Sequence, residues 1–176
     1  MHIIIRKEEV SDHEAVFNLI EKAFEKEPYS DHQEQFLVER LRKSTAFVPE
    51  LALVAVLDNE VVGYTLLTKI QIANEHTSAT SLALAPVAVL PTYQRKGIGG
   101  RLIGAAHEKA TELGFGSVVL LGHEKYYPRF GYEPAGKFGI KLPFDVPAEN
   151  CMAIELVEGA LSNVSGVVEY PHEFSG

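Results

Sequence analysis

The sequence predicts one mixed α+β domain, and three observations lead to that prediction. The chain has 176 residues, 46% of them hydrophobic, which suits a single globular core of ordinary size. Apolar runs typical of strands alternate with amphipathic helical segments along most of the chain. Residues 84–115 have the form strand, glycine-rich turn and helix, and another apolar run follows directly, which indicates a right-handed parallel crossover.

The charge distribution favours a small anionic ligand over a nucleic acid. The net charge is −8, whereas a duplex-binding protein needs a broad basic face. Between Pro91 and Ala106, however, the only charged residues are Arg95, Lys96 and Arg101, all positive. A local positive site on an acidic protein suits a compact polyphosphate.

The sequence also predicts a cytoplasmic protein that does not cross a membrane. No apolar run approaches the ~20 residues that a bilayer requires. Charged residues follow the N-terminal apolar run too soon for a signal peptide. Cys151 is the only cysteine, so no intrachain disulfide is possible, and a reducing compartment is expected.

The first elements are a strand and a helix. Residues 2–7 form a short apolar run that predicts a strand. Ser11 and Glu14 have the spacing of a capping box. Apolar residues then recur with helical period over 16–24, and Pro28 is expected to end that helix.

A second helix and a hairpin come next. The helix is expected to open at Ser30 and Asp31, with Phe36, Leu37 and Leu41 on its inner face. Residues 51–57 and 61–72 flank a polar turn and are rich in strand-forming residues, which predicts an antiparallel hairpin.

The central segment predicts a strand over 79–90, a helix over 97–113 and a strand over 117–121 that is buried on both faces. Gly114 is the expected stop of the helix. The predicted buried stripe of the helix is Ile98, Leu102, Ala106, Ala110 and Leu113.

The C-terminal third is less regular. Residues 124–130 predict a short helix that Pro128 limits, and 138–142, 151–156 and 166–170 are candidate strands. No linker divides the chain, so residues 1–176 are expected to form one domain, with residues 158–176 as its ill-defined tail.

Pro86 lies in the middle of the central strand, where it removes a hydrogen bond and marks an edge or a bulge. If the strand separates from 117–121, the backbone groups of 87–89 lose their partners. A ligand with amides in an extended chain, such as the pantetheine arm of coenzyme A, would satisfy them. An ordinary bulge satisfied by water is the alternative.

The turn after this strand matches neither common phosphate-binding motif. Leu102 stands where the dinucleotide fingerprint needs its third glycine, and no Gly-Lys-Ser or Gly-Lys-Thr occurs. What remains is the run from Gln94 to Gly99 at a helix start. There free backbone N–H groups and the helix dipole favour an anion.

This run resembles the GNAT superfamily of N-acetyltransferases, whose pattern is Gln/Arg-x-x-Gly-x-Gly/Ala between a strand and a long helix. Gln94, Gly97 and Gly99 fill it. The segment from Tyr126 to Tyr132 is similar to the Tyr-x-x-x-Gly-Phe/Tyr segment of the family. The residues of that segment most resemble those of the bacterial YhbS-like subgroup.

The resemblance implies a GNAT fold, with a mixed, mostly antiparallel sheet flanked by helices and a splayed parallel pair formed by 79–90 and 117–121. It also implies that acetyl-CoA lies between the splayed strands, with its pyrophosphate on the N–H groups of about 95–100. Gly97 and Gly99 would stay small to leave phosphate space; a tight turn with a close helix contact is the alternative. The residues implied in donor binding are Val87, Ala88, Val89, Gln94, Arg95, Lys96, Gly97, Ile98, Gly99, Gly100 and Tyr126.

The implied reaction is direct transfer of the acetyl group to a primary amine. A backbone N–H near Val87 or Ala88 is the expected oxyanion donor. Tyr127 occupies the position of the family's tyrosine, four residues before Gly131, and is the expected general acid for the leaving thiolate. Tyr126 is the alternative, and both tyrosines as packing residues is a third interpretation.

The general base is not evident. Many relatives carry a glutamate on the central strand, whereas residues 79–90 contain no acid here. His123 and Glu124 are weak base candidates by position alone, and Glu75 and His76 are weaker. No cluster has metal-ligand spacing, so no metal is expected. Cys151 is expected to be a buried strand residue and not an acetyl-cysteine nucleophile.

Two other functions stay open. The chain could be a non-catalytic acyl-CoA-binding sensor of the same fold, or an unrelated nucleotide-binding domain that takes ATP. The expected acceptor is an amine-bearing small molecule or protein. Its pocket is expected from the first two helices, the loop 74–78 and residues 138–150. A homodimer is possible, with the run 166–170 extending a sheet or docking on a partner.

Overall fold

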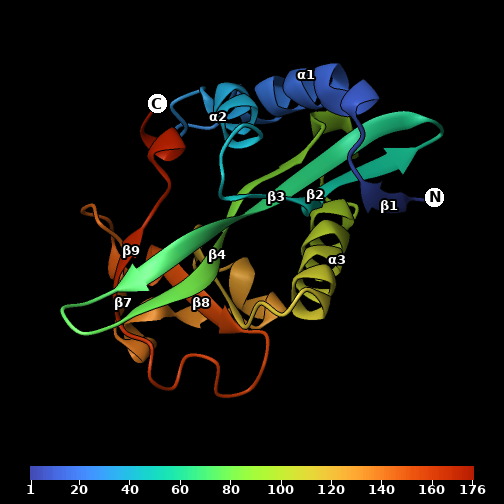
Figure 1. Cartoon of the computed structure of the whole chain (residues 1–176). Coiled ribbons are helices and arrows are strands. Elements are labelled where there is room, and N and C mark those ends of the chain that lie inside the picture. The colour runs from blue at the N-terminus through green and yellow to red at the C-terminus, as the bar shows by residue number, and fades with distance from the viewer.

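The computed structural model describes residues 1–176 and shows a twisted sheet with helices on both faces (Figure 1). The nine strands pair in the order β1-β2-β3-β4-β5-β8-β6, and β9 pairs with β3 and β7. Only β4/β5 and β7/β9 are parallel. The strands are β1 Ile4–Lys7, β2 Phe47–Leu57, β3 Glu60–Ala73, β4 Ser78–Val89, β5 Ser117–Leu121, β6 Glu133–Pro134, β7 Ile140–Lys141, β8 Cys151–Glu155 and β9 Gly166–Glu169.

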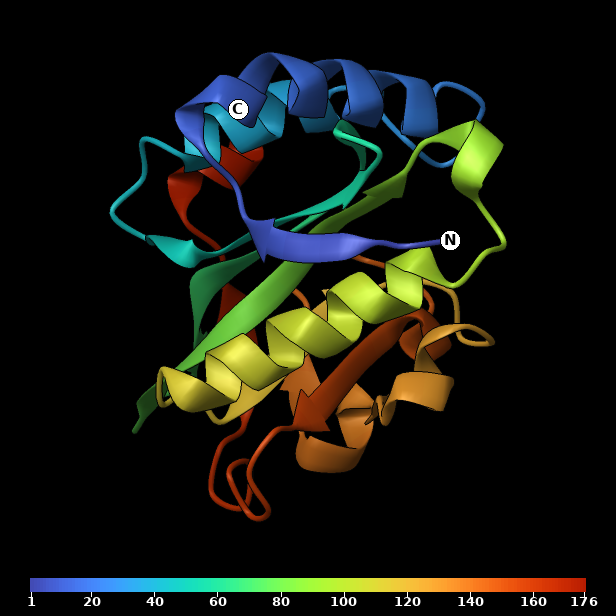
Figure 2. The same cartoon turned by 90° about the vertical axis from the view of Figure 1, so that its right-hand side faces the viewer.

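The helices divide between the two faces of the sheet. Helices α1 (His13–Phe24) and α2 (Glu34–Leu41) lie together over one face, and α3 (Ile98–Glu112) runs across the other (Figure 2). The strand, helix and strand order β4-α3-β5 confirms the predicted parallel crossover. The sequence prediction of a mixed α+β fold is therefore correct.

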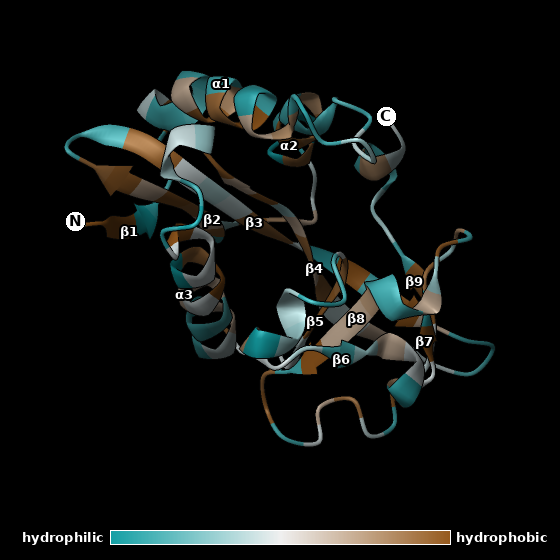
Figure 3. Cartoon of the chain, turned by 180° about the vertical axis from the view of Figure 1, so that it is seen from behind, coloured by the Kyte–Doolittle hydropathy of each residue, from teal (hydrophilic) through white to brown (hydrophobic).

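Each face of the sheet has its own core. Leu82 and Val118 pack with α3, whereas Val54 and Tyr64 pack under α1 and α2. A third cluster lies beneath the C-terminal segments and includes Ala83, Val119 and Val168. Hydropathy follows this layout: brown residues recur along the strands, and the helices alternate between teal and brown (Figure 3). Because alternate strand residues face opposite sides, Ala83 and Val119 face away from α3.

The tail of the chain is built into the sheet. Strand β2 pairs with β3 only as far as Thr68, and β9 takes the same edge of β3 from Gln71 to Ala73. Strand β7 then joins β9 on its other side. The run 166–170 therefore pairs within the chain.

Several local predictions are wrong. The capping box is formed by Glu9 and Asp12 ahead of α1, and not by Ser11 and Glu14, because a 3₁₀ turn (Val10–Asp12) precedes the helix. In α2 the buried apolar residues are Val38 and Leu41, while Phe36 is exposed and packs edge-on against Phe17.

Other boundary errors lie at element ends. Leu113 is exposed because α3 ends at Glu112, and Ile103 is buried in its place. Leu121 is exposed at the end of β5, so that strand is buried on both faces only up to Leu120. The predicted helix 124–130 is a 3₁₀-helix, η3 (Tyr127–Phe130), and the predicted strand 138–142 shortens to β7.

Candidate active site

The turn between β4 and α3 presents a run of unpaired backbone N–H groups. The first helical hydrogen bond of α3 is from the Arg101 N–H to the Gly97 carbonyl oxygen, at 3.1 Å. None of the six N–H groups from Arg95 to Gly100 donates to another backbone group. A helix start always leaves four such donors; here the turn adds those of Arg95 and Lys96.

Two left-handed residues give the turn its shape. Arg95 has φ 65° and Gly97 has φ 82°. Alternation of left-handed and right-handed residues turns successive N–H groups into a concave anion site. The side chains of Arg95 and Lys96 are exposed beside it, whereas Arg101 points elsewhere and donates to the Ile3 carbonyl oxygen at 3.1 Å.

The three glycines have different reasons to be small. A Cβ on Gly97 would meet nothing within 4 Å, so this position is constrained by its positive φ. A Cβ on Gly99 would lie 3.1 Å from the Tyr126 hydroxyl oxygen, and one on Gly100 would lie 3.1 Å from the Phe130 ring. The last two glycines therefore allow α3 to pack closely on η3.

Strands β4 and β5 form a fork. They pair only at Leu82–Val118 and Ala83–Val119. Beyond that point β4 stays on β3, and β5 stays on β8 as far as Leu121–Cys151. At the fork β4 also bulges: two residues, Ala85 and Pro86, stand opposite Leu66 alone. Both features that Pro86 suggested are thus present, a bulge toward β3 and a separation from β5.

The fork leaves two N–H groups of β4 without a strand partner. Leu90 donates its N–H to the Val62 carbonyl oxygen at 2.9 Å, so residues of β4 alternate from there between β3 and the fork. By this alternation Ala88 pairs with Tyr64 of β3. The N–H groups of Val87 and Val89 face the fork.

Tyr126 and Tyr127 lie on the α3 face of the fork. A Cβ on Gly99 would be 3.9 Å from both the Val87 and Val89 side chains, in the same space as the Tyr126 hydroxyl. The structure thus brings the turn, the end of β4 and Tyr126 together. Tyr127 packs edge-on against Tyr126, with 5.0 Å between ring centroids, and lies against the backbone of Gly122.

Burial raises the pKa of Tyr127 to about 12, with a smaller contribution from neighbouring Tyr126. Its phenol is therefore protonated at neutral pH. On its far side Tyr127 contacts the Tyr132 ring, at 5.8 Å between centroids. Tyr132 in turn shares a 2.7 Å hydrogen bond with Nε2 of His107 from α3. Burial lowers the pKa of His107 to about 4, so that imidazole is neutral.

The base candidates are dispersed. His123 and Glu124 are both exposed; the His123 carbonyl oxygen accepts the Tyr126 N–H at 3.1 Å, and a Glu124 carboxylate oxygen accepts from Asn150 at 3.1 Å. Glu75 and His76 lie in the turn before β4, beyond Ser78, and the strand from Ser78 to Val87 alone spans about 30 Å at roughly 3.3 Å per residue. Burial raises the pKa of the Cys151 thiol, which lies in β8.

A cavity of about 790 Å³ opens at the fork on the face away from α3. It is lined by β4 at Ala83–Ala85, by β5 at Val119–Leu121 and by the C-terminal segment at Val167–Tyr170. The sequence predicted an acceptor pocket formed by the first two helices, the 74–78 loop and residues 138–150. Leu37 of α2 and Phe144 line this cavity, whereas α1 and the 74–78 loop do not. The residues of the tail that line the cavity were not predicted. The only signal for them in the sequence is the apolar character of several residues in 164–174, which does not show what they pack against.

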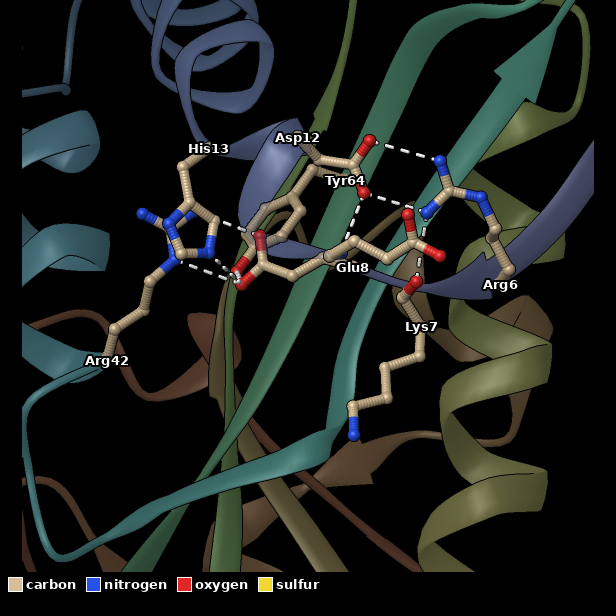
Figure 4. A network of polar contacts seen from close by, with 8 residues as sticks. Arg6, Lys7, Glu8, Asp12, His13, Arg42 and Tyr64 are labelled. Carbon is tan, nitrogen blue, oxygen red and sulfur yellow. Dashed lines mark hydrogen bonds and ion pairs between the residues drawn. The ribbon is translucent and has the colours of Figure 1, made fainter.

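A buried polar network lies between the sheet and the helices on that same face (Figure 4). Arg42 donates to both carboxylate oxygens of Glu8, at 3.0 and 2.9 Å. Tyr64 donates to Glu8 at 3.4 Å. Both carboxylate oxygens of Glu8 therefore have partners, and the charge of Arg42 neutralises that of Glu8. The network connects the end of β1 to the end of α2 and to β3.

The chain is similar to known acetyltransferases. The family described as "Acetyltransferase (GNAT) domain" matches residues 4–135. The uncharacterized N-acetyltransferase YjhQ of Escherichia coli strain K12 is 40% identical over 119 residues, which cover 67% of this chain and 66% of YjhQ. The chain belongs to the GNAT family.

Solved GNAT structures agree over the whole chain. The crystal structure of the GNAT family N-acetyltransferase YhbS from Escherichia coli in complex with CoA has a TM-score of 0.89 at 26% identity, covering 100% of this chain and 93% of YhbS. A GNAT family acetyltransferase from Brucella melitensis in complex with acetyl-CoA has a TM-score of 0.81 at 29% identity, covering 98% of each chain. The predicted family, its YhbS-like character and the fold are confirmed.

Two further observations bound the GNAT domain. None of its helices is both long and apolar enough to cross a bilayer. No three His, Cys, Asp or Glu side chains are grouped so that they would hold a metal ion.

Proposed function

We propose that this GNAT domain transfers the acetyl group of acetyl-CoA directly to a primary amine, in the cytoplasm. The observation that carries the proposal is that two sets of unpaired backbone N–H groups lie one after the other. Six of them belong to the turn, and those of Val87 and Val89 face the fork. A pyrophosphate followed by an extended arm with amides matches both sets in that order.

The donor would be held mainly by backbone. Its pyrophosphate would lie on the N–H groups from Arg95 to Gly100, with the exposed Arg95 and Lys96 beside it. Its pantetheine amides would bond the Val89 N–H and the Val87 carbonyl oxygen, which extends the sheet at the place where β5 departs and leaves the Val87 N–H for the thioester. Tyr126 would border this channel beside Gly99.

The chemical step follows from this placement. The amine nitrogen attacks the thioester carbonyl carbon, the carbon–sulfur bond breaks, the nitrogen loses a proton and the sulfur gains one. Because the Ala88 N–H is directed at β3, the Val87 N–H is the proposed oxyanion donor. Tyr127 would donate its phenolic hydrogen bond to the departing sulfur, since its pKa of about 12 keeps the phenol protonated.

The amine must arrive neutral, because only the neutral form is a nucleophile. For a lysine-like amine of pKa ~10.4, deprotonation at pH 7 costs about 4 kcal/mol. Strand β4 offers no carboxylate, and His123 and Glu124 are exposed. We therefore assign proton removal to water reached from the fork, with His123 and Glu124 as the side chains to test.

A matched pair of variants tests the donor site. Asn tolerates a positive φ, so Gly97→Asn keeps the turn, while Gly97→Asp adds one negative charge in the same shape. We expect Gly97→Asp to bind CoA at least about tenfold more weakly than Gly97→Asn by calorimetry. Gly104→Asp, on the open side of the same helix, is the control for charge alone.

Release of free thiol with a panel of amines tests the reaction. Acetylated product with acetyl-CoA supports the proposal. CoA binding without acetylation of any amine would favour the non-catalytic sensor. Binding of ATP in preference to CoA, with equal affinity of the two Gly97 variants for CoA, would contradict the donor assignment.

A further inference from the structure

The fork cavity is on the opposite side of the sheet from the donor turn. Val119 and Ala83 line the cavity and belong to the core beneath the C-terminal segments. Val87, Tyr126 and Tyr127 pack on the α3 side. Strands β4 and β5 separate beyond Ala83 and Val119, and Ala85, one of the two bulge residues, lines the cavity. A molecule in the cavity would therefore reach the α3 side of the sheet at Ala85.

The cavity walls are almost entirely apolar. Twelve of the fifteen lining residues are hydrophobic, and none is Lys or Arg. Glu169 is the only charged residue among them. On β9 it alternates with Val168, whose side chain enters the core, so the Glu169 carboxylate lies on the other face of the strand.

Three aromatic rings form the outer wall. Phe144 stacks on Tyr170 at 6.0 Å between centroids and an angle of 15°, and Tyr170 contacts Phe174 at 4.9 Å. A volume of about 790 Å³ lies within the roughly 300–1,000 Å³ of pockets that take small molecules. Stacked rings and branched side chains favour a flat apolar group and disfavour polar or multiply charged ones.

We infer that the acceptor is a small primary amine with an apolar body the size of an aromatic ring, bound in the fork cavity with its amino group toward Ala85. This inference rests on the proposed acetyltransferase function and specifies its substrate class. Apolar walls also favour the neutral amine over the ammonium ion. The cavity itself thus promotes the proton loss for which β4 supplies no base.

The test compares amines at saturating acetyl-CoA, with product mass as the readout. The probes are 2-phenylethylamine, ethanolamine, spermidine and a lysine peptide. We expect kcat/KM for 2-phenylethylamine to exceed that for ethanolamine by roughly tenfold or more, because the two differ by a buried ring. Preference for spermidine, the peptide or ethanolamine would overturn the inference and leave the proposed function standing.

Two variants locate the amine. Leu121 lines the cavity and is partly exposed, so Leu121→Trp would fill space there without disturbing the core. We expect it to raise KM for 2-phenylethylamine at least about fivefold with an unchanged Kd for CoA. Leu113→Trp, at the exposed end of α3, is the matched control.

Phe144→Ala removes one ring of the wall, and Phe36→Ala removes a similarly exposed ring outside it. Only the former is expected to reduce the preference for 2-phenylethylamine over ethanolamine. If Leu121→Trp or Phe144→Ala weakens CoA binding and leaves amine selection intact, the cavity belongs to the donor and the inference is wrong. A failure of CoA binding in the unsubstituted protein would instead contradict the proposed function.

Discussion

The side-chain amide of Gln94 donates a hydrogen bond to the backbone carbonyl oxygen of Val89, at 3.0 Å. This bond joins the turn to the last residue of β4. The Val89 carbonyl oxygen is thus satisfied by Gln94. The Val89 N–H stays free to donate to a carbonyl of the bound coenzyme A. The Gln94 side chain therefore holds the turn against the end of β4, while the backbone N–H groups from Arg95 to Gly100 remain unpaired.

Replacing Gln94 tests that role. Gln94→Ala should weaken CoA binding by about 1 kcal/mol, roughly fivefold, because one hydrogen bond is lost. Gln94→Glu should weaken it further, since a carboxylate would face both the Val89 carbonyl and the pyrophosphate. Calorimetry measures both, and the control is Gln71→Ala, a β3 residue whose side-chain amide donates to Thr80 near the start of β4. Wild-type affinity in Gln94→Glu would contradict the assignment.

Tyr127→Phe should lower kcat by roughly 100-fold, because a proton donor to the leaving group is lost. The Kd for CoA should change little. Tyr126→Phe is the matched control and should keep most of kcat; the reverse result would transfer the role to Tyr126.

The pH profile gives a second test of Tyr127. Its pKa is raised to about 12, so the phenol stays protonated and contributes no loss of rate between pH 7 and 10. The rate should rise over that range as the amine loses its proton. A fall above pH 9 that disappears in Tyr127→Phe would show that the phenol titrates lower than expected.

His107 should make folding stability depend on pH. Its folded pKa of about 4 lies below the unfolded value of 6.5, so the unfolded chain binds more protons between these values. The free energy of unfolding should therefore fall as pH drops from 6.5 to 4, by up to about 3 kcal/mol. Urea titrations of wild type and His107→Gln at pH 7, 6 and 5 measure this, and equal slopes would rule out His107 as the source.

The Glu8–Arg42 pair should be worth far more than an exposed pair. Arg42→Ala leaves the buried Glu8 carboxylate with only the Tyr64 hydroxyl at 3.4 Å and His13 at 4.0 Å, and should lower the free energy of unfolding by about 3 kcal/mol. Lys109→Ala breaks the exposed pair with Glu112 and should change it by less than about 0.5 kcal/mol. Glu8→Gln in the Arg42→Ala background should recover part of the loss, as urea denaturation would reveal.

Sequence reasoning succeeded where the signal was local. The helix of residues 98–112 was placed within one residue at each end, because Gly97 marks its start and Gly114, with its positive φ, marks its stop. Pro86 correctly indicated where β4 would bulge and leave β5. The exposed Phe36 and Leu113 were misplaced because periodicity does not reveal where a helix face runs past its neighbours.

The parts of the site that sequence reasoning missed depend on contacts between distant residues. No local pattern pairs Ile72 with Val168 or His107 with Tyr132. The insertion of β9 beside β3 follows from where β2 stops pairing, at Thr68, which only the assembled sheet shows. The C-terminal wall of the cavity could not be anticipated for the same reason.

The insertion of β9 has a consequence for how such proteins diversify. The family match ends at residue 135, after the turn, the fork and both tyrosines, whereas Phe144, Tyr170 and Phe174 follow it. The residues proposed to bind acetyl-CoA thus lie before residue 135, and the aromatic wall of the proposed amine cavity lies after it. Substitutions in the second stretch would therefore change which amine the proposed acceptor cavity takes, while the residues proposed to bind acetyl-CoA stay as they are.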